Sequence, residues 1–405
     1  MPQECTFDVV VIGAGIAGSA LALALSGNGL AIAVVEAQPM VRKPLPREPG
    51  LGAFDARVSA LTPKSVSLLQ GLDAWEAIAA YRHCAYRHMN VWDAEGTGRI
   101  EFDCDELDVP VLGHIVENRA IVDSLLERIE AATDIRRCSP DKLEACDRNH
   151  DGTLNVTLSS GEQLQTRLVV GADGALSRVR EMFAFQTREW DYGHQALVCT
   201  VQVSRDHQST AWQRFLPTGP LAFLPLPGTE REHYCSIVWS VQDEVAEKLL
   251  ALDEREFCDE IASAIEHCLG DVVAASPRFA FPLRQRHAVD YVQPGVALVA
   301  DAAHTIHPLA GQGINLGLQD VSVLAEELLS AHARDMPLGQ LDVLGRYQRR
   351  RKGENLLMMG AMDGFKRLFE QQALPLRWLR NAGLRGVARF TPLKLRLMRH
   401  AMGID

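Results

Sequence analysis

The chain contains short apolar runs that each end at a glycine or an acidic residue. Runs at 7–12, 31–35, 168–170 and 296–300 have the continuous apolar character of strands buried on both faces of a sheet. From 183 to 282 apolar and polar positions alternate instead, in runs at 196–203, 212–216, 221–226 and 234–241. Such alternation is typical of antiparallel strands. The pattern predicts an α/β fold in which two kinds of sheet occupy different stretches of the chain.

Apolar residues at spacings of three and four predict the helices. Thr62 followed by Pro63 has the form of a helix start, because a hydroxyl caps the first turn and proline fits the first helical position, and Gly71 marks its end. An amphipathic helix follows 114–119, residues 245–268 form one or two more, and a long helix begins near Gly313. Residues 135–170 are predicted to form strands and turns.

The first apolar run leads into the turn GAGIAG at 13–18 and then into a helix that extends to about Ser26. The next strand ends at Glu36, eighteen residues after Gly18. A strand, a G-x-G-x-x-G turn, a helix and an acid at the end of the next strand form the dinucleotide-binding fingerprint. In this interpretation Gly13, Gly15 and Gly18 let the backbone approach a pyrophosphate, and Glu36 binds ribose hydroxyls. The alternative is a glycine-rich turn with an ordinary charge at the strand end.

Two later strands end in segments of similar character. The run at 168–170 is followed by GADGALSRVR, which contains Asp173, and the run at 296–300 is followed by DAAHTIHPLAGQGINLG, which begins with Asp301. Ligands of open α/β sheets bind at the carboxyl ends of strands. A helix that begins near Gly313 would also direct free N–H groups and its positive dipole end toward a ligand, which favours negative charge. Both acids are therefore candidates for ligand binding.

These segments resemble the motifs of a known family. The stretch from Asp301 to Asp320 is similar to the second flavin-binding motif of the FAD-dependent aromatic hydroxylases with the para-hydroxybenzoate hydroxylase fold, and GADGALSRVR matches the middle motif of that family. Over most of the chain the closest resemblance is to the ubiquinone-biosynthesis hydroxylases, in particular to those acting on a 2-polyprenylphenol at carbon 6, as in HIVENR, WDYGHQALVCT, LAFLPLP and CSIVWS. Ala300 departs from the usual family glycine, and we interpret it as tolerated at a negative φ.

The resemblance implies FAD as the cofactor and assigns residues to it. The residues expected to contact FAD are Gly13, Gly15, Gly18, Glu36, Arg57, Asn118, Asp173, Asp301, Pro308, Gly311, Gln312, Gly313 and Asn315. Three of them have alternatives, which are a solvated or salt-bridged Arg57, a plain N-terminal cap for Asn118, and a cap of the following helix for Asp173.

Two histidines suggest a catalytic role, because the charge of histidine changes near neutral pH. His304 is more typical of a structural residue beneath the flavin loop. His307 lies beside Pro308, nearer to where a substrate would meet the flavin, and is the candidate catalytic residue.

The implied activity is that of a flavoprotein monooxygenase that hydroxylates a polyprenylphenol in ubiquinone biosynthesis. NADPH or NADH would reduce FAD, and the reduced flavin and O2 would supply the hydroxyl group. The chain has no second G-x-G-x-x-G, so the nicotinamide nucleotide is expected to bind transiently. Alternatives are another flavin oxidoreductase on the same fold, although the W-x-W-x-I-P segment of halogenases is absent, and a non-catalytic flavin-binding assembly protein.

The expected organisation has three parts. A Rossmann-like FAD-binding domain takes residues 1–182 and 283–345, an antiparallel-sheet substrate domain takes 183–282, and a helical C-terminal region takes 346–405. The period change at about 183 and the return of a buried strand at 296 are the basis of these boundaries.

Composition and charge argue against several other classes of protein. A chain of 405 residues with 47% hydrophobic content can bury a large core, and no apolar run reaches the roughly 20 residues of a membrane span. The net charge of −11 argues against nucleic-acid binding. The nine cysteines include no C-x-x-C pair and no metal-ligand spacing, so reduced thiols and no bound metal are expected. No signal peptide is recognisable, which predicts a cytoplasmic location.

The C-terminal residues are basic, unlike the rest of the chain. Residues 364–405 contain nine basic and two acidic residues, a local charge of +7. A polyprenyl substrate favours an apolar phase by about 4 kcal/mol for each five-carbon unit, so it is expected at a bilayer or within a protein complex. The basic, leucine-rich stretch at 374–402 is the predicted contact surface, through Arg385, Arg389, Lys394 and Arg396. The alternative is a helix pair packed on the body of the protein with a solvated basic face.

Overall fold

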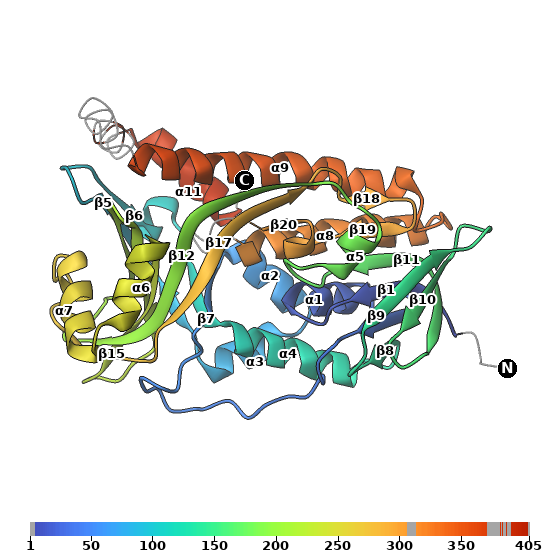
Figure 1. Ribbon diagram of the computed structural model, residues 1–405, viewed down its shortest axis with the longest axis horizontal. Coiled ribbons are helices and arrows are strands. Elements are labelled where there is room, and N and C mark those ends of the chain that lie inside the picture. The colour runs from blue at the N-terminus through green and yellow to red at the C-terminus, as the bar shows by residue number, and fades with distance from the viewer. Residues whose placement is uncertain are drawn as a thin grey trace.

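Three β-sheets and the helices packed on them build the protein (Figure 1). The computed structural model describes residues 5–305, 313–370, 381, 383, 386 and 390–403. In this part of the chain the two large sheets lie toward opposite ends of the long axis, and the long helix α9 (Leu341–Glu370) runs along one side of both (Figure 1). The α/β class predicted from the apolar pattern is therefore confirmed.

The first large sheet has a parallel centre. Its strand order is β18-β19-β11-β1-β2-β8, and β10 pairs with both β11 and β9. Neighbours from β19 to β8 run parallel, and β9, β10 and β18 are antiparallel additions. The strands are β1 (Cys5–Ile12), β2 (Ile32–Val35), β8 (Ile135–Cys138), β9 (Leu143–Arg148), β10 (Leu154–Leu158), β11 (Gln163–Gly171), β18 (Val292–Gln293) and β19 (Val296–Leu298). The apolar residues of the central strands are buried on both faces, as their sequences predict.

The second large sheet is mainly antiparallel. Its order is β20-β17-β12-β15-β14-β13-β5-β6, with β16 also paired to β12, and only β13 and β5 run parallel among the described pairs. The strands are β5 (His88–Asp93), β6 (Arg99–Asp103), β12 (Thr187–Val203), β13 (Thr210–Leu216), β14 (Gly219–Leu226), β15 (His233–Gln242), β16 (Val272–Ala275), β17 (Phe279–Ala288) and β20 (His304–Thr305). Helices α6 (Asp243–Ala251) and α7 (Glu254–Ala264) pack on this sheet, where Trp239, Phe257 and Ile261 share one core.

Two long strands extend between the large sheets. β12 and β17 pair from Thr187 and Ala288 to Val198 and Phe279, with an irregularity between Asp191 and Gln195, and Figure 1 shows the pair crossing the middle of the molecule. A small third sheet, with the order β3-β7-β4, contains β3 (Val58–Leu61), β4 (Cys84–Tyr86) and β7 (Gly113–Glu117).

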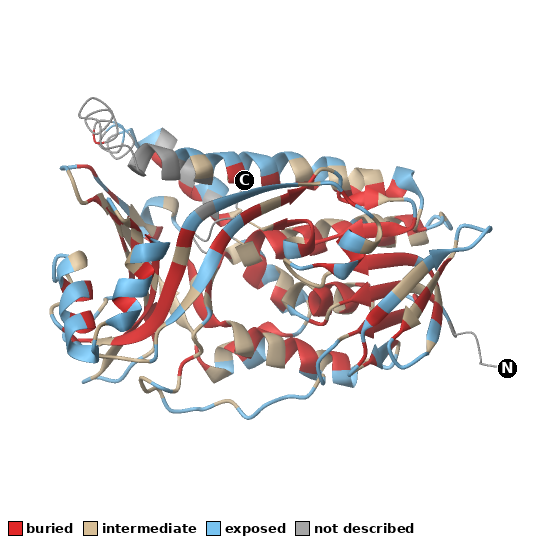
Figure 2. Cartoon of the chain, viewed as in Figure 1, coloured by how far each residue is buried: buried red, intermediate tan, exposed pale blue. Residues whose placement is uncertain are grey.

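The remaining helices pack mainly around the first sheet. α1 contacts α4 and α8, and α8 contacts α9. They are α1 (Ile16–Leu25), α2 (Pro63–Gly71), α3 (Trp75–Tyr81), α4 (Asn118–Ala131), α5 (Arg178–Met182), α8 (Gly313–His332) and α11 (Thr391–Met402), with 3-10 turns η1 (Cys104–Leu107) and η2 (Ala300–Ala302). Figure 2 shows buried residues facing inward and exposed residues facing outward on α4 and α9. Thr62 caps α2 by accepting a hydrogen bond from Ser65 N, which confirms the predicted helix start.

The second large sheet includes two strands from outside the predicted substrate domain. β5 and β6, at 88–103, belong to the second large sheet although they precede residue 183 by about eighty positions. β5 pairs with β13 and β6 pairs with β5, so a pairing between strands distant in sequence places both in this sheet. The boundaries themselves stay a prediction.

One residue of the predicted basic C-terminal surface is buried. Lys394 is 8% exposed and pairs with Glu106 of η1, while Met398 and Met402 of α11 pack with Cys104. The inclusion of Lys394 in an exposed basic face is therefore wrong, because its charge is neutralised inside a packed contact. Arg396 is exposed, and Arg385 and Arg389 lie outside the described residues.

Ala300 has a left-handed backbone, with a φ of 53°. The interpretation that alanine is tolerated here at a negative φ is therefore wrong. Ala300 N donates to Asp320 Oδ2 at 3.1 Å, which holds the turn. A Cβ on Gly317 would lie 2.7 Å from the Ala300 Cβ, so the missing side chain of Gly317 provides the space for the Ala300 methyl group.

Ala300→Gly is expected to raise the free energy of unfolding by up to about 1 kcal/mol, because relief of left-handed strain exceeds the added chain entropy of glycine. Ala303 has a φ of −89°, so Ala303→Gly should instead lower it by about 0.5–1 kcal/mol or more. Urea denaturation measures both values. Equal destabilisation by the two substitutions would show that residue 300 carries no strain.

Candidate functional site

Three sequence motifs meet at one edge of the first sheet. In the parallel register Ile12 lies beside Gly171, and Gly171 lies beside Leu298, so β1, β11 and β19 end together. Backbone bonds continue past the strand ends, from Ala172 N to Ile12 O at 2.8 Å and from Val299 N to Gly171 O at 3.0 Å. The glycine turn, the middle motif and the Asp301 motif are therefore neighbours at the carboxyl edge, where ligands of α/β sheets bind.

The three glycines of the first motif have different surroundings. Gly13 has a φ of 102°, and a Cβ there would lie 2.5 Å from Ala172 O. A Cβ on Gly18 would lie 1.9 Å from Gly13 O. Around the Cβ position of Gly15 there is no atom within 4 Å, and Gly15 precedes α1 without a side-chain cap. Gly13 and Gly18 thus serve close packing, whereas Gly15 leaves open space beside free N–H groups of a helix start, which suits a phosphate.

Glu36 braces the same turn from the end of β2. Its Oε2 accepts from Ala14 N at 2.8 Å, and its Oε1 accepts from Gln38 N at 2.9 Å. The carboxylate is half-buried next to the glycine turn, so it is not merely a solvated charge at a strand end. This position is compatible with the predicted ribose contact.

Asp173 has one bonded and one unbonded carboxylate oxygen. Oδ2 accepts from Arg178 N at 2.7 Å and from Val179 N at 3.2 Å, so the side chain does bind the start of α5, whose N-cap residue is Ser177. Oδ1 is buried and has no hydrogen-bond partner in the described part of the protein. A buried acceptor without a partner is costly, and a ligand hydroxyl at this edge would satisfy it.

Asp301 and Arg57 reach this edge from distant parts of the sequence. Asp301 lies in η2 and retains an exposed surface, yet desolvation raises its pKa, and the charges of His304 and Arg57 act in the opposite direction. The Arg57 side chain is exposed, and its influence on Asp301 indicates that the two groups are near each other. The pair could hold a polar ligand between opposite charges.

Two predicted cofactor contacts are already engaged with protein. Asn315 is fully buried, accepts from Thr62 N at 3.0 Å and Ser65 Oγ at 2.7 Å, and donates to Ala60 O. These bonds give its side chain a structural role between α8 and α2, and its role toward FAD stays a prediction. For Asn118 the plain-cap alternative is wrong, because Glu117 is the N-cap residue.

The side chain of Asn118 accepts from Ser59 Oγ at 2.6 Å, and its proposed contact with FAD stays a prediction. Gly313 is the first residue of α8 that the structure describes. Pro308, Gly311, Gln312 and the candidate catalytic residue His307 lie outside the described residues.

A buried carboxylate behind the site was not predicted. Asp320 of α8 accepts from Ala300 N, His304 Nε2 at 2.5 Å, Arg351 Nε at 2.8 Å and Asn355 Nδ2 at 3.1 Å. Burial alone would raise the pKa of Asp320, but His304 and Arg351 lower it to about 2. His304 is 2% exposed, which supports the structural interpretation of this histidine. An acidic residue on the apolar face of a helix is the sequence signal that could have revealed it.

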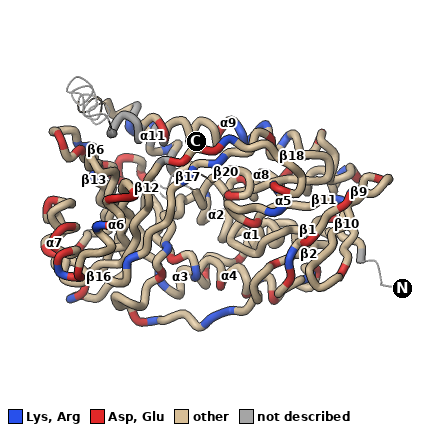
Figure 3. Tube along the Cα trace, in the orientation of Figure 1, with Lys and Arg blue, Asp and Glu red and all other residues tan. Residues whose placement is uncertain are grey.

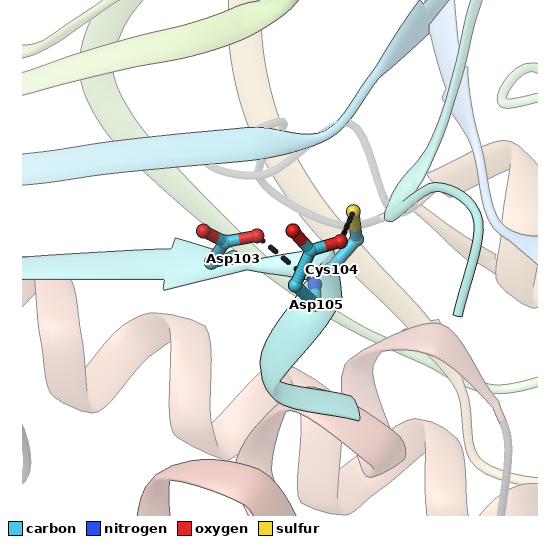
Figure 4. Close-up of side chains that lie close together, drawn as sticks. All are labelled: Asp103, Cys104 and Asp105. Atoms are coloured by element: carbon cyan, nitrogen blue, oxygen red, sulfur yellow. Dashed lines mark hydrogen bonds between the residues drawn. The ribbon is translucent and has the colours of Figure 1, made fainter. Parts of the chain in front are cut away.

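One group of potential metal donors is explained without a metal (Figure 4). Asp103 accepts from Asp105 N at 2.9 Å as the cap of η1, and Asp105 accepts from Arg87 at 2.7 Å. Burial raises the pKa of the Cys104 thiol, so it stays protonated and is a poor ligand. The eight cysteines that the structure characterises are free.

The residues described here fit FAD. The open space at Gly15 suits a pyrophosphate, and the unpaired Asp173 oxygen suits a hydroxyl. The fold and the three motifs at one sheet edge define the class as an FAD-dependent monooxygenase. Residues 6–353 match the family model described as "FAD binding domain". The chain belongs to this family and, within it, to the ubiquinone-biosynthesis hydroxylases.

The relatives span almost the whole chain. It is 39% identical over 400 residues to the 3-demethoxyubiquinol 3-hydroxylase of Escherichia coli strain K12, covering 98% of each. It is 36% identical to the mitochondrial ubiquinone biosynthesis monooxygenase COQ6 of Homo sapiens, covering 98% of this chain and 93% of the relative. In fold it is similar to pqsL, a probable FAD-dependent monooxygenase from Pseudomonas aeruginosa, with a TM-score of 0.77 at 23% identity over 94% and 100% of the two chains.

Gly15→Ala should leave the stability of the FAD-free protein within about 0.5 kcal/mol of wild type, because its Cβ meets only open space. It should weaken FAD binding about tenfold or more, because the methyl group occupies the phosphate approach. Gly18→Ala is the matched comparison and should cost about 1–3 kcal/mol of fold stability, since its Cβ strikes Gly13 O. Thermal unfolding and fluorescence titration with FAD measure these effects. Unchanged FAD affinity in Gly15→Ala would contradict the phosphate assignment.

Proposed function

We propose that this enzyme hydroxylates the ring of a polyprenylphenol in ubiquinone biosynthesis, using NADPH or NADH and O2. The main support is full-length similarity to ubiquinone-pathway hydroxylases, at 39% identity over 98% of the chain, combined with the three motifs at the carboxyl edge of the first sheet. FAD supplies the oxygen-activating chemistry when it is bound.

The residues of the chain would bind and orient. Gly15 and the start of α1 would receive the pyrophosphate, and Glu36 would take the ribose hydroxyls. Asp173 would use its unpaired oxygen, and Asp301 would accept from a ribitol hydroxyl with Arg57 as a nearby positive charge. These groups account for FAD retention. They leave proton transfer to the substrate without an assigned residue in the described part of the chain.

Two ring positions are candidates for hydroxylation. The fragments WDYGHQALVCT, LAFLPLP and CSIVWS in the second sheet support carbon 6 of a 2-polyprenylphenol. The Escherichia coli relative at 39% identity is a 3-demethoxyubiquinol 3-hydroxylase, which supports carbon 3. We favour carbon 6 and retain carbon 3 as the second candidate.

Deletion of the gene should stop ubiquinone synthesis at the step this enzyme performs, and mass spectrometry of lipid extracts identifies the precursor. Accumulated 2-polyprenylphenol is expected for carbon 6, whereas accumulated 3-demethoxyubiquinol would establish carbon 3. Re-expression of the wild-type gene should clear the precursor, and Asp301→Ala should clear it poorly because FAD is lost. Normal quinone levels without a precursor would contradict both candidates.

We infer that the substrate reaches the enzyme at a bilayer or from a partner protein. Among the described helices none combines the length and apolarity needed to cross a membrane, so contact would be peripheral. Figure 3 shows basic positions along α9 and α11 at one edge of the molecule. On α11 and just before it, Arg396 and Arg399 are exposed and Phe390 is 60% exposed, a combination suited to an anionic lipid surface.

The double substitution of Arg396 and Arg399 by Glu is expected to weaken binding to anionic liposomes about thirtyfold or more in a sedimentation assay, because attraction to anionic lipid is about 1 kcal/mol per basic residue. FAD content should not change, since α11 packs on η1 and neither arginine is among the residues assigned to FAD. Arg334→Glu, on the segment after α8, provides a control of equal charge change per residue. Unchanged liposome binding in the double variant would assign α11 to packing alone.

A further inference from the structure

Two buried charges hold the segment that leads into β3. Glu117, at the end of β7, is 2% exposed, and Arg82, after α3, is 7% exposed. Arg82 donates to Glu117 Oε1 from Nε at 2.9 Å and from Nη2 at 2.7 Å, and its guanidinium carbon lies 4.5 Å from the centre of the Phe54 ring. We call this pair the Arg82–Glu117 clamp.

Three of the other bonds of the clamp go to the backbone of residues 48–55, while Arg82 Nη2 also donates to the Tyr81 hydroxyl at 2.6 Å and Glu117 Oε2 accepts from Arg119 Nη2 at 2.6 Å. Arg82 donates from Nη1 to Glu48 O at 2.9 Å and from Nη2 to Ala53 O at 2.8 Å. Glu117 Oε2 accepts from Asp55 N at 2.7 Å. Both side chains therefore bind successive positions of one segment and fix its path.

Arg57 lies at the end of this segment. Its N–H donates to Asp55 Oδ1 at 3.1 Å, and its carbonyl accepts from Asn118 N at 3.0 Å. Asp55 Oδ2 accepts in turn from Arg119 N at 3.1 Å. The backbone on either side of Arg57 is thus anchored, while its side chain is exposed and its charge opposes the desolvation that raises the pKa of Asp301.

We propose that Glu117, Arg82 and Asp55 are positioning residues for FAD, because they hold the backbone that presents Arg57 to the cofactor. The inference rests on the assignment of Arg57 to FAD and does not depend on which ring position is hydroxylated. Arg82 and Glu117 are bonded to that backbone. They act through Arg57.

Stability alone does not require this arrangement. Apolar residues of similar volume often stabilise a core as well as a buried ion pair does, because the pair must first lose its hydration. An ion pair with directed bonds to three backbone groups instead fixes the path of the backbone at residues 48–55. The preceding residues 41–49 are mostly exposed and in no helix or strand, so the clamp is where this long connection becomes fixed.

A double-mutant cycle on FAD affinity tests the proposal. Glu117→Gln is expected to raise the FAD dissociation constant about tenfold or more, because hydrogen bonds to a charged group are lost and Arg57 is released. In an Arg57→Ala background the same substitution should add less than about twofold, because the residue it positions is gone. Asp55→Ala, in a half-buried position, should show the same non-additivity and remains informative if Glu117→Gln folds poorly.

Arg42→Gln is the matched control. Arg42 ties an earlier part of the same connection to Asp123 at 2.9 Å through an exposed pair, so its loss should leave FAD affinity unchanged. Fluorescence titration of the FAD-free protein gives the FAD dissociation constant, and thermal unfolding in parallel gives the fold stability. Neither measurement needs a substrate. Additive losses in the Arg57→Ala background would overturn the proposal, and so would wild-type affinity in Arg57→Ala itself.

Discussion

The architecture around the FAD edge depends on one carboxylate, that of Asp320, which is excluded from water. Four donors from three separate segments converge on it, namely Ala300 N, His304, Arg351 and Asn355. A buried charge is tolerated only when it is fully paired, and removal of one partner typically costs about 3–5 kcal/mol. Asp320 therefore obliges η2, β20, α8 and α9 to take one relative position. The same contacts support the left-handed turn at Ala300, from which Asp301 emerges.

A second constraint is the parallel register. β1, β11 and β19 are adjacent and end together. Residues more than 120 positions apart in sequence therefore become neighbours at the ends of these strands. A Cβ on Gly13 would lie 2.5 Å from Ala172 O, so the missing side chain of Gly13 permits the close contact between the two motifs. The residues proposed to bind FAD are distributed over this edge, and the proposed positioning of Arg57 by buried charges would extend the same arrangement to the third sheet.

Many of the strands and helices could be predicted from the sequence, because local patterns of apolar and capping residues specify them. Continuous apolar runs identified β1, β2, β11 and β19, alternation identified β12 to β15, and Thr62-Pro63 identified the start of α2. The features that were missed are those defined by distant partners. The φ of Ala300 depends on the absence of a side chain at Gly317, and the burial of Lys394 depends on Glu106. The bonds of Asp320 and of Glu117 likewise join segments whose contact no local pattern encodes.

The burial of the free cysteines affects how readily their thiols are oxidised. A flavoprotein that activates O2 works beside an oxidant, and thiols are oxidised through their thiolate form. Burial raises the pKa of Cys84 to about 12 and those of Cys138 and Cys268 to about 11. At neutral pH these three thiols are then almost entirely protonated. We therefore expect the packing of these three thiols also to slow their oxidation by peroxide, without a disulfide among the cysteines described.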